Sequence, residues 1–172
     1  ANNGSVDLAL HAQRNTVFPE LPRFGLRLFL PQEMSQVNYY GMGPMECYRD
    51  KHHAASHSSY TATVWQLHED YIRPQENGSH FDCDYVMLAG DAVRLTAVGT
   101  QPFSFNASHY TQEELTRKAH NYELEPCGST VLCLDYAQNG IGSESCGPRL
   151  LEQYRLDDAT FNFGLRLFPE KK

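Results

Sequence analysis

Period-two alternation of apolar residues is the feature that most constrains how this chain folds. In segment 6–12 every second residue from Val6 to Ala12 is apolar, and segment 24–30 repeats the pattern from Phe24 to Leu30. Such alternation is typical of strands with one buried face. Further strands are expected around Trp65 and Leu67 and at 82–89, 92–98, 102–107, 129–136, 151–156 and 160–168. About nine strands without βα repeats predict an all-β fold, a single antiparallel sandwich.

One short helix is predicted at 111-TQEELTRKAH-120. Thr111 and Glu114 have the spacing of a capping box, and acidic residues occupy the first turn, where the helix dipole favours them. Leu115 and Ala119 form a narrow apolar stripe. We therefore expect a surface helix that lies against a sheet.

Composition excludes several classes of protein. The net charge of -7 over 172 residues argues against a general nucleic-acid binder, which needs a basic surface. No apolar run approaches the ~20 residues of a membrane span. The five cysteines are an odd number without CxxC spacing, which favours reduced thiols in a cytosolic protein. The first residue is Ala1, and we expect the chain to be a piece of a longer protein.

The segment 39-YYGMGPMECYRDKHH-53 has two interpretations. Its Glu, Cys, Asp and His residues are possible metal ligands, but alternate side chains of an extended segment point to opposite faces. A sharp structural turn is favoured, because glycine permits positive φ and proline fixes the next residue. The predicted turn residues are Gly41, Gly43, Pro44, Glu46 and Asp50.

Catalytic and metal sites are not evident elsewhere. The histidines at 52, 53, 57 and 68 are irregularly spaced, which favours solvated side chains over a zinc site. Glu113 and Glu114 are neighbours on the predicted helix and diverge, so they do not form the facing carboxylate pair of a glycosidase. No metal site and no catalytic residue is predicted in this chain.

The segment 139-NGIGSESCGP-148 follows a strongly apolar strand and combines small residues with Glu144 and Cys146. A glycine-rich loop on a rigid β scaffold is a common place for a binding surface. The alternative is a long exposed connection with a buried cysteine, and the residues alone favour that alternative.

Four segments together resemble one family. They are 40-YGMGPMECYRDK-51, 74-PQENG-78, 103-FSFNASHYTQEEL-115 and 120-HNYEL-124 continuing through 135-DYAQNGIGSESCGP-148. Their order and spacing resemble the C-terminal domain, or small chain, of the β-galactosidases of glycoside hydrolase family 2. The resemblance implies an antiparallel β-supersandwich like that of galactose mutarotase. It also implies that residues 1–172 are one domain, the C-terminal portion of that supersandwich.

The resemblance further implies a function. The parent enzyme would hydrolyse terminal β-D-galactosides such as lactose, with its catalytic glutamates on a separate TIM-barrel domain. This chain would be non-catalytic and would bind no cofactor, whereas the barrel of the parent would use Mg²⁺ and a monovalent cation. Expected partners are the remaining domains or large subunit, the galactoside substrate and a second copy in a homo-oligomer, with no nucleic acid or membrane. The expected location is the cytoplasm.

The resemblance also assigns roles to residues. The family's form of the turn is G-x-G-P-x-E-x-Y-x-D, which this chain matches from Gly41 to Asp50. In family members the loop that corresponds to 139–148 reaches the mouth of the barrel, where a tryptophan stacks on the aglycone sugar. Cys146 stands at that position, and with Glu144 and Ser145 it is expected to form the aglycone rim of the substrate site.

Two other functions are considered. A stand-alone carbohydrate-binding sandwich would use Tyr39, Tyr40 or Trp65 as a stacking platform for a sugar. A mutarotase-like epimerase would need a histidine and a carboxylate that converge in a concavity of the sheet, and the sequence shows no such convergence.

Overall fold

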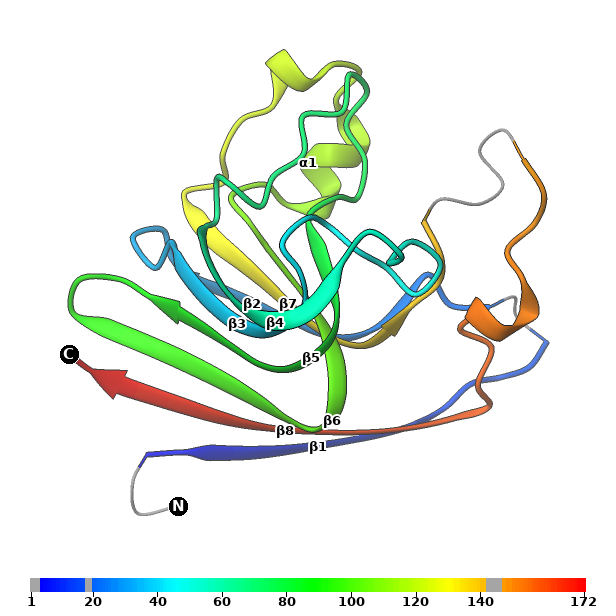
Figure 1. The fold of residues 1–172 in the computed structure, drawn as a ribbon, viewed down its shortest axis with the longest axis horizontal. Coiled ribbons are helices and arrows are strands. Elements are labelled where there is room, and N and C mark those ends of the chain that lie inside the picture. The colour runs from blue at the N-terminus through cyan, green and yellow to red at the C-terminus, as the bar shows by residue number, and fades with distance from the viewer. Residues whose placement is uncertain (1–3, 18–19, 142–146) are drawn as a thin grey trace.

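The chain folds into antiparallel strands with very little helix (Figure 1). The structure, a computed structural model, describes residues 4–17, 20–141 and 147–172. The strands are β1 (Val6–Gln13), β2 (Arg23–Pro31), β3 (Gln36–Gly43), β4 (Ser56–Thr63), β5 (Ser79–Ala89), β6 (Val93–Ser108), β7 (Ser129–Gln138) and β8 (Thr160–Lys171). The helical elements are α1 (Gln112–Arg117) and the 3-10 turns η1 (Asn121–Glu123) and η2 (Glu152–Tyr154).

The strands form one forked sheet. Its main path runs β1-β8-β6-β5-β3-β4, and β7 pairs with both β6 and β2. The first half of the long strand β6 pairs with β8 over 93–99, whereas its second half pairs with β7 over 104–108. Two pairs of strands, β8-β1 and β7-β2, therefore extend from β6 as separate arms, each paired with a different half of that strand (Figure 1). The predicted antiparallel all-β fold with one short helix is confirmed.

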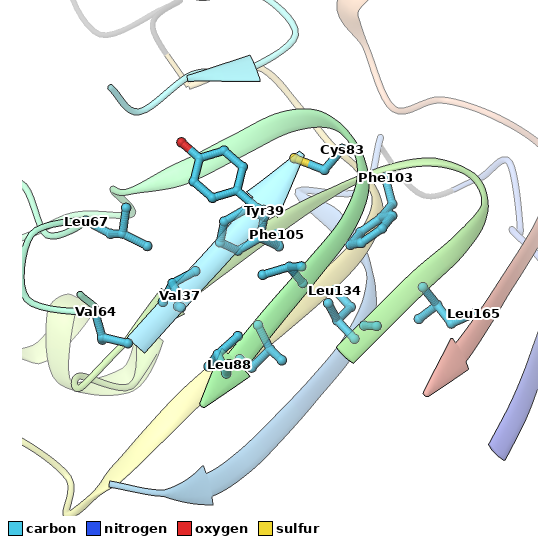
Figure 2. Close-up of a cluster of buried hydrophobic side chains, with 14 of the residues drawn as sticks. Val37, Tyr39, Val64, Leu67, Cys83, Leu88, Phe103, Phe105, Leu134 and Leu165 are labelled. Atoms are coloured by element: carbon cyan, nitrogen blue, oxygen red, sulfur yellow. The ribbon is translucent and has the colours of Figure 1, made fainter. Parts of the chain in front are cut away.

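The core lies where the arms and the central strands face one another (Figure 2). Leu88 of β5, Leu134 of β7 and Leu165 of β8 are almost completely buried in one cluster. Val64 and Leu67, from the segment after β4, belong to the same cluster. Each such buried aliphatic side chain contributes about 2 kcal/mol. The apolar residues that alternate along β1 and β2 pack against this cluster, so the two arms share one core.

Two expected strands are wrong, and two others are parts of one strand. The segment around Trp65 and Leu67 is a turn, in which the Leu67 N–H donates to the Thr63 carbonyl over 3.2 Å. Its apolar side chains separate because Leu67 enters the core while Trp65 remains 50% exposed. The expected strand 151–156 contains the 3-10 turn η2. The expected strands 92–98 and 102–107 are the two halves of β6.

The predicted turn begins later than expected, because Gly41 and Gly43 lie in β3. Neither glycine is among the described glycines with positive φ, so the conformational argument made from the sequence is wrong. Close approach explains Gly41, since a Cβ there would lie 2.3 Å from Cys83 Sγ and 2.8 Å from Cys83 Cα. The turn proper starts at Pro44, after a cis Gly43–Pro44 peptide bond.

The helix is present but shorter than the predicted span 111–120. Thr111 caps its N-terminus, where the Thr111 hydroxyl accepts the Glu114 N–H over 3.1 Å. Leu115 is buried, whereas Ala119 lies beyond the helix and is exposed. The helix and η1 pack with the segment after β4 into a cap at one end of the sheet (Figure 1). Among the described helices, none is long and apolar enough to cross a membrane.

Candidate functional site

The turn after β3 is organised around a buried carboxylate. Glu46 is 8% exposed and accepts hydrogen bonds on both of its oxygens. Lys51 Nζ donates to Oε1 over 2.6 Å, and the Tyr71 hydroxyl donates to the same oxygen. The Gly78 N–H donates to Oε2 over 2.9 Å, and the Tyr48 hydroxyl over 3.3 Å. Glu46 therefore joins the turn to the start of β5.

Electrostatics keep this carboxylate ionised. Burial raises the pKa of Glu46, but the hydrogen bonds from Lys51, Tyr71 and Gly78 outweigh burial, so the pKa lies below its ordinary value. Burial also raises the pKa of the Tyr48 hydroxyl, which remains a neutral donor. A carboxylate with this many donors has little capacity left for a ligand, so its role is structural.

A second carboxylate of the turn contacts the beginning of the 139–148 segment. Asp50 Oδ1 accepts the Ile141 N–H over 3.2 Å. At Gly140 a Cβ would lie 2.5 Å from Asp50 Oδ2 and 2.3 Å from Leu150 Cδ1. A side chain at position 140 would therefore displace the side chains of Asp50 and Leu150.

Further hydrogen bonds hold the residues on either side of positions 142–146, namely Asn139 on one side and Leu150 on the other. The Asn139 N–H donates to the Pro22 carbonyl over 2.8 Å, and Asn139 Oδ1 accepts the Leu156 N–H over 3.0 Å. On the other flank Arg155 Nε donates to the Leu150 carbonyl over 3.1 Å. Asn139 is thus tied to Pro22 and Leu156, and Leu150 is tied to Arg155.

A partly buried charge network lies beside Asn139, where the 139–148 segment begins. Arg23 Nε and Nη2 donate to the two oxygens of Asp135 over 3.2 and 2.5 Å, and Gln138 Nε2 donates to Asp135 over 3.2 Å. Arg23 Nη1 also donates to Glu76 Oε2 over 3.2 Å. Among the described residues, Glu76 Oε1 is buried without a hydrogen-bond partner. Burial raises the pKa of both carboxyl groups, and Arg23 opposes that shift.

A shallow cavity of about 270 Å³ opens between this network and the first flank. Its lining includes Arg23, Glu76, Gln138, Asn139 and Ile141. It is smaller than the pockets of roughly 300–1,000 Å³ that usually enclose a ligand. The cavity is therefore a shallow crevice beside residues 139–141.

The structure brings together part of the predicted site. Glu46 and Asp50 lie in the turn, as expected, and Asp50 contacts the 139–148 segment, which the sequence did not predict. The rim residues Glu144, Ser145 and Cys146 lie outside the described residues. Glu113 binds Arg27 over 2.8 Å, while Glu114 binds Arg117, so these carboxylates have separate partners.

Three of the four histidines of the rejected zinc site also have separate partners. His52 Nδ1 lies 3.2 Å from the Tyr48 carbonyl, His57 lies 3.9 Å from Asp84, and His68 lies 3.5 Å from Asp70. In the part of the chain that the structure describes, no three His, Cys, Asp or Glu side chains are grouped as a metal site.

The candidate platforms for sugar stacking differ in exposure. Tyr39 is 1% exposed and packs in the core, so its prediction as a platform is wrong. Tyr40 is 38% exposed beside His57, and Trp65 is 50% exposed over the ring of His109. Only the last two present a ring to solvent.

Sequence reasoning missed Arg23, Asp135 and Glu76. One signal was available, because Asp135 is a charged residue within the apolar strand 129–136. A charge at a buried strand position requires a partner of opposite charge. The pattern does not identify Arg23, which is 112 residues away in the chain.

Comparison with known proteins identifies the family to which the chain is similar. A family model described as the beta galactosidase small chain matches residues 1–167. A beta-galactosidase from Actinobacillus pleuropneumoniae is 48% identical over 170 residues, which cover 99% of this chain and 16% of that protein. A beta-galactosidase from Staphylococcus xylosus is 42% identical over 165 residues, covering 96% of this chain and 17% of that protein. A third, from Kluyveromyces lactis, is 32% identical over 146 residues, or 84% of this chain and 14% of that protein.

The chain therefore spans about a sixth of the length of the first two of these relatives. The match covers nearly the whole chain, including the turn around Glu46 and the 139–148 segment that Asp50 contacts. On these grounds the chain belongs to the family of β-galactosidase small-chain domains.

Proposed function

We propose that this chain is the non-catalytic C-terminal domain of a β-galactosidase that hydrolyses terminal β-D-galactosides of the lactose type. The observation that carries the proposal is the small-chain match over residues 1–167, together with relatives named beta-galactosidase that are about six times longer. The partners of this domain are the remaining domains or the large subunit of the enzyme. The free thiols of the described cysteines favour a reducing, cytoplasmic location.

In this proposal the chemistry belongs to another part of the enzyme. Two glutamates of a TIM-barrel domain would carry out hydrolysis with retention, and Mg²⁺ and a monovalent cation would bind to that domain. This chain would contribute the 139–148 segment, with Glu144, Ser145 and Cys146 on the rim of the aglycone subsite. The fixed flanks of the segment support such a role, because a subsite needs a rigid support.

Activity assays of two proteins test the proposal. The full-length protein that carries this chain should hydrolyse an aryl β-D-galactoside, and should hydrolyse the matching β-D-glucoside far more slowly. The isolated chain of 172 residues should hydrolyse neither substrate. Absence of galactosidase activity in the full-length protein, or activity that stays with the isolated chain through re-purification, would contradict the proposal.

Cys146 tests the assignment of the rim. A tryptophan offers a broad face to a sugar ring, and its contact area is worth roughly 1–2 kcal/mol more than that of a thiol, or about a tenfold change in affinity. Cys146→Trp in the full-length enzyme should therefore lower KM for lactose and tighten glucose binding, with little change in galactosyl transfer. KM and glucose affinity that both stay within about twofold would remove Cys146 from the subsite.

A carbohydrate-binding module is the second candidate, and the half-exposed ring of Trp65 favours it. Trp65 is the single tryptophan of the chain, so its fluorescence reports directly on a bound sugar. A saturable change with galactose would support this function, whereas the rim function predicts no saturation. The epimerase gains little support, because the approach of His57 to Asp84 is long, at 3.9 Å, and the Asp84 side chain is 54% exposed.

A further inference from the structure

We propose that a crevice at the fork of the sheet is a binding site for a neutral sugar ring. This fork crevice has a volume of about 200 Å³, and its lining includes Arg49, Asp82, Gln101, Ser104 and Tyr136. Its sides come from the turn after β3 and from β5, β6 and β7. The site is built by this chain alone, so it does not depend on the reaction proposed for the parent enzyme.

The crevice lies where the sheet divides. The first half of β6 pairs with β8 and the second half with β7, so residues 100–103 lie between the two arms. Over the same stretch the register between β6 and β5 shifts, between Cys83 and Tyr85 of β5. Gln101 and Pro102 therefore belong to an excursion of β6 that pairs with neither arm, and both are exposed.

A β-bulge in β5 forms one side of the crevice. Phe81 and Asp82 stand opposite the single residue Ser104 of β6, because the register shifts here by one residue. Asp82 has a φ of 55°, and it is the non-glycine residue with positive φ in the part of the chain that the structure describes. Bulges redirect side chains and are common beside active sites, and aspartate tolerates positive φ better than most residues. The bulge thus explains why Asp82 lines the crevice.

A second bulge, in β7, supplies an aromatic ring. Tyr136 is the extra residue where the register between β7 and β2 shifts. The rings of Phe24, Phe161 and Phe163 pack edge-to-face against the Tyr136 ring, at centroid distances from 5.6 to 6.4 Å. These contacts fix the orientation of Tyr136, which also lines the crevice. A fixed aromatic ring is a suitable surface for the apolar face of a sugar.

The polar side chains of the crevice have bonding capacity that the described part of the chain does not use. There the Asp82 carboxylate has neither a hydrogen bond nor an ion pair, and only the Asp82 carbonyl has a partner, His57 Nε2 at 3.0 Å. Among the same residues Arg49 makes one hydrogen bond, from Nη1 to the Arg155 carbonyl over 3.4 Å, and no ion pair. The Gln101 amide group likewise bonds to no described residue. Donors and acceptors are therefore both available to a ligand.

These groups favour a neutral ligand that carries hydroxyl groups. The charges of Arg49 and Asp82 oppose each other, so the crevice attracts neither an anion nor a cation strongly. A hydroxyl group both donates and accepts, so neighbouring hydroxyls of one sugar ring can bond to the guanidinium and to the carboxylate. The crevice is smaller than the roughly 300–1,000 Å³ of usual ligand pockets. It therefore suits a single ring, with a Kd on the order of 1–10 mM.

An NMR titration of the chain of 172 residues tests the site. D-Galactose and D-glucose are the probes, and shifts of the assigned backbone amides locate the bound sugar. At least one of the two sugars should cause saturable shifts centred on residues 81–82, 101–104 and 136–137, with a Kd on the order of 1–10 mM. Inorganic phosphate and ethylammonium, at matched concentrations, should cause no saturable shifts at these residues.

Three variants assign the shifts to the crevice. Asp82→Asn removes the charge of the carboxylate and keeps a residue that tolerates positive φ, and Arg49→Gln removes the guanidinium from a different element. Each should weaken sugar binding about threefold to tenfold, as expected for the loss of one hydrogen bond. Asp91→Asn is the matched control at an exposed aspartate between β5 and β6, and should leave the Kd unchanged. The amide spectrum of each variant reports whether the fold is kept.

Several results would overturn the site. These are the absence of saturation with both sugars, binding that Asp82→Asn and Arg49→Gln leave unchanged, and saturable shifts at the crevice with phosphate or ethylammonium alone. Sugar-induced shifts at Trp65, which does not line the crevice, would support the stacking platform instead. None of these results bears on the galactosidase assays of the full-length protein, so failure of this site is separate from failure of the proposed function.

Discussion

At the scale of single residues, Glu46 shows what the sequence could and could not predict. The motif predicted a structural turn that contains Glu46, and in the structure the Glu46 carboxylate is buried and accepts the Gly78 N–H. Its partners Tyr71 and Gly78 are 25 and 32 residues away along the chain. Local patterns report spacing within one element, so pairing across elements, like that of Arg23 with Asp135, is visible only in the fold.

Removing the charge of Glu46 should destabilise the domain. Glu46→Gln replaces one acceptor oxygen by an NH₂ group that faces donors, so hydrogen bonds from groups such as Gly78 N–H are lost. Unpaired buried donors and a lost charge-assisted bond predict a fall of about 2–4 kcal/mol in the free energy of unfolding. Urea unfolding of the isolated chain measures this fall, with Glu33→Gln, at an exposed site, as the control. A fall below about 1 kcal/mol would mean that the network is weak in solution.

The lowered pKa of Glu46 has a consequence for stability against pH. A carboxyl group whose pKa is lower in the folded state contributes stability above its unfolded value, here 4.5, and loses it as pH falls through the folded pKa. The unmodified chain should therefore lose more stability below pH 4.5 than Glu46→Gln does. Urea midpoints between neutral pH and acid pH measure the difference. If the urea midpoints of the two proteins fall in parallel as the pH is lowered, the pKa of Glu46 is not lowered in the folded state.

At the scale of elements, alternation predicted strands well where one face is buried and failed elsewhere. β1, β2, β7 and β8 were expected from their patterns and are present. β3 was missed because its glycines were taken as turn residues, although they serve close strand packing. The turn at Trp65 and Leu67 was taken as a strand because two apolar residues at period two also fit a turn that buries only one of them. The Asp50 contact was beyond prediction, because it joins segments 91 residues apart.

The glycine in β3 gives a prediction for this element. Gly41→Ala would place a Cβ 2.8 Å from the Cys83 Cα atom, and a backbone atom cannot move aside cheaply. Overpacking of this kind should cost about 1–3 kcal/mol in the free energy of unfolding. Thermal unfolding of the isolated chain measures it, with Gly147→Ala as the matched control, since a Cβ there meets nothing within 4 Å. Equal stability of the two variants would mean that β3 and β5 are not packed this closely.

At the scale of the whole molecule, the forked sheet leaves edges unpaired. Among the described residues, β1, β2 and β4 each pair with a single neighbour. β4 is rich in serine and threonine, whereas β2 carries Leu26, Leu28 and Leu30, which are only partly buried against the core. An apolar edge strand with free backbone groups is a template for another strand. β2 is therefore an apolar edge strand that can pair with a strand of another molecule.

The isolated chain should accordingly self-associate through β2. Phe29 is 56% exposed on this edge strand, and burying one such ring is worth about 1–2 kcal/mol, or about tenfold in affinity. Sedimentation velocity should show a dimer or larger species at high concentration, and Phe29→Lys should weaken association about tenfold, because a lysine blocks an edge. Tyr122→Lys is the control, since Tyr122 is 80% exposed on η1, away from the strand edges. A monomer at every concentration refutes the association, and equal weakening by both lysine variants moves the contact away from β2.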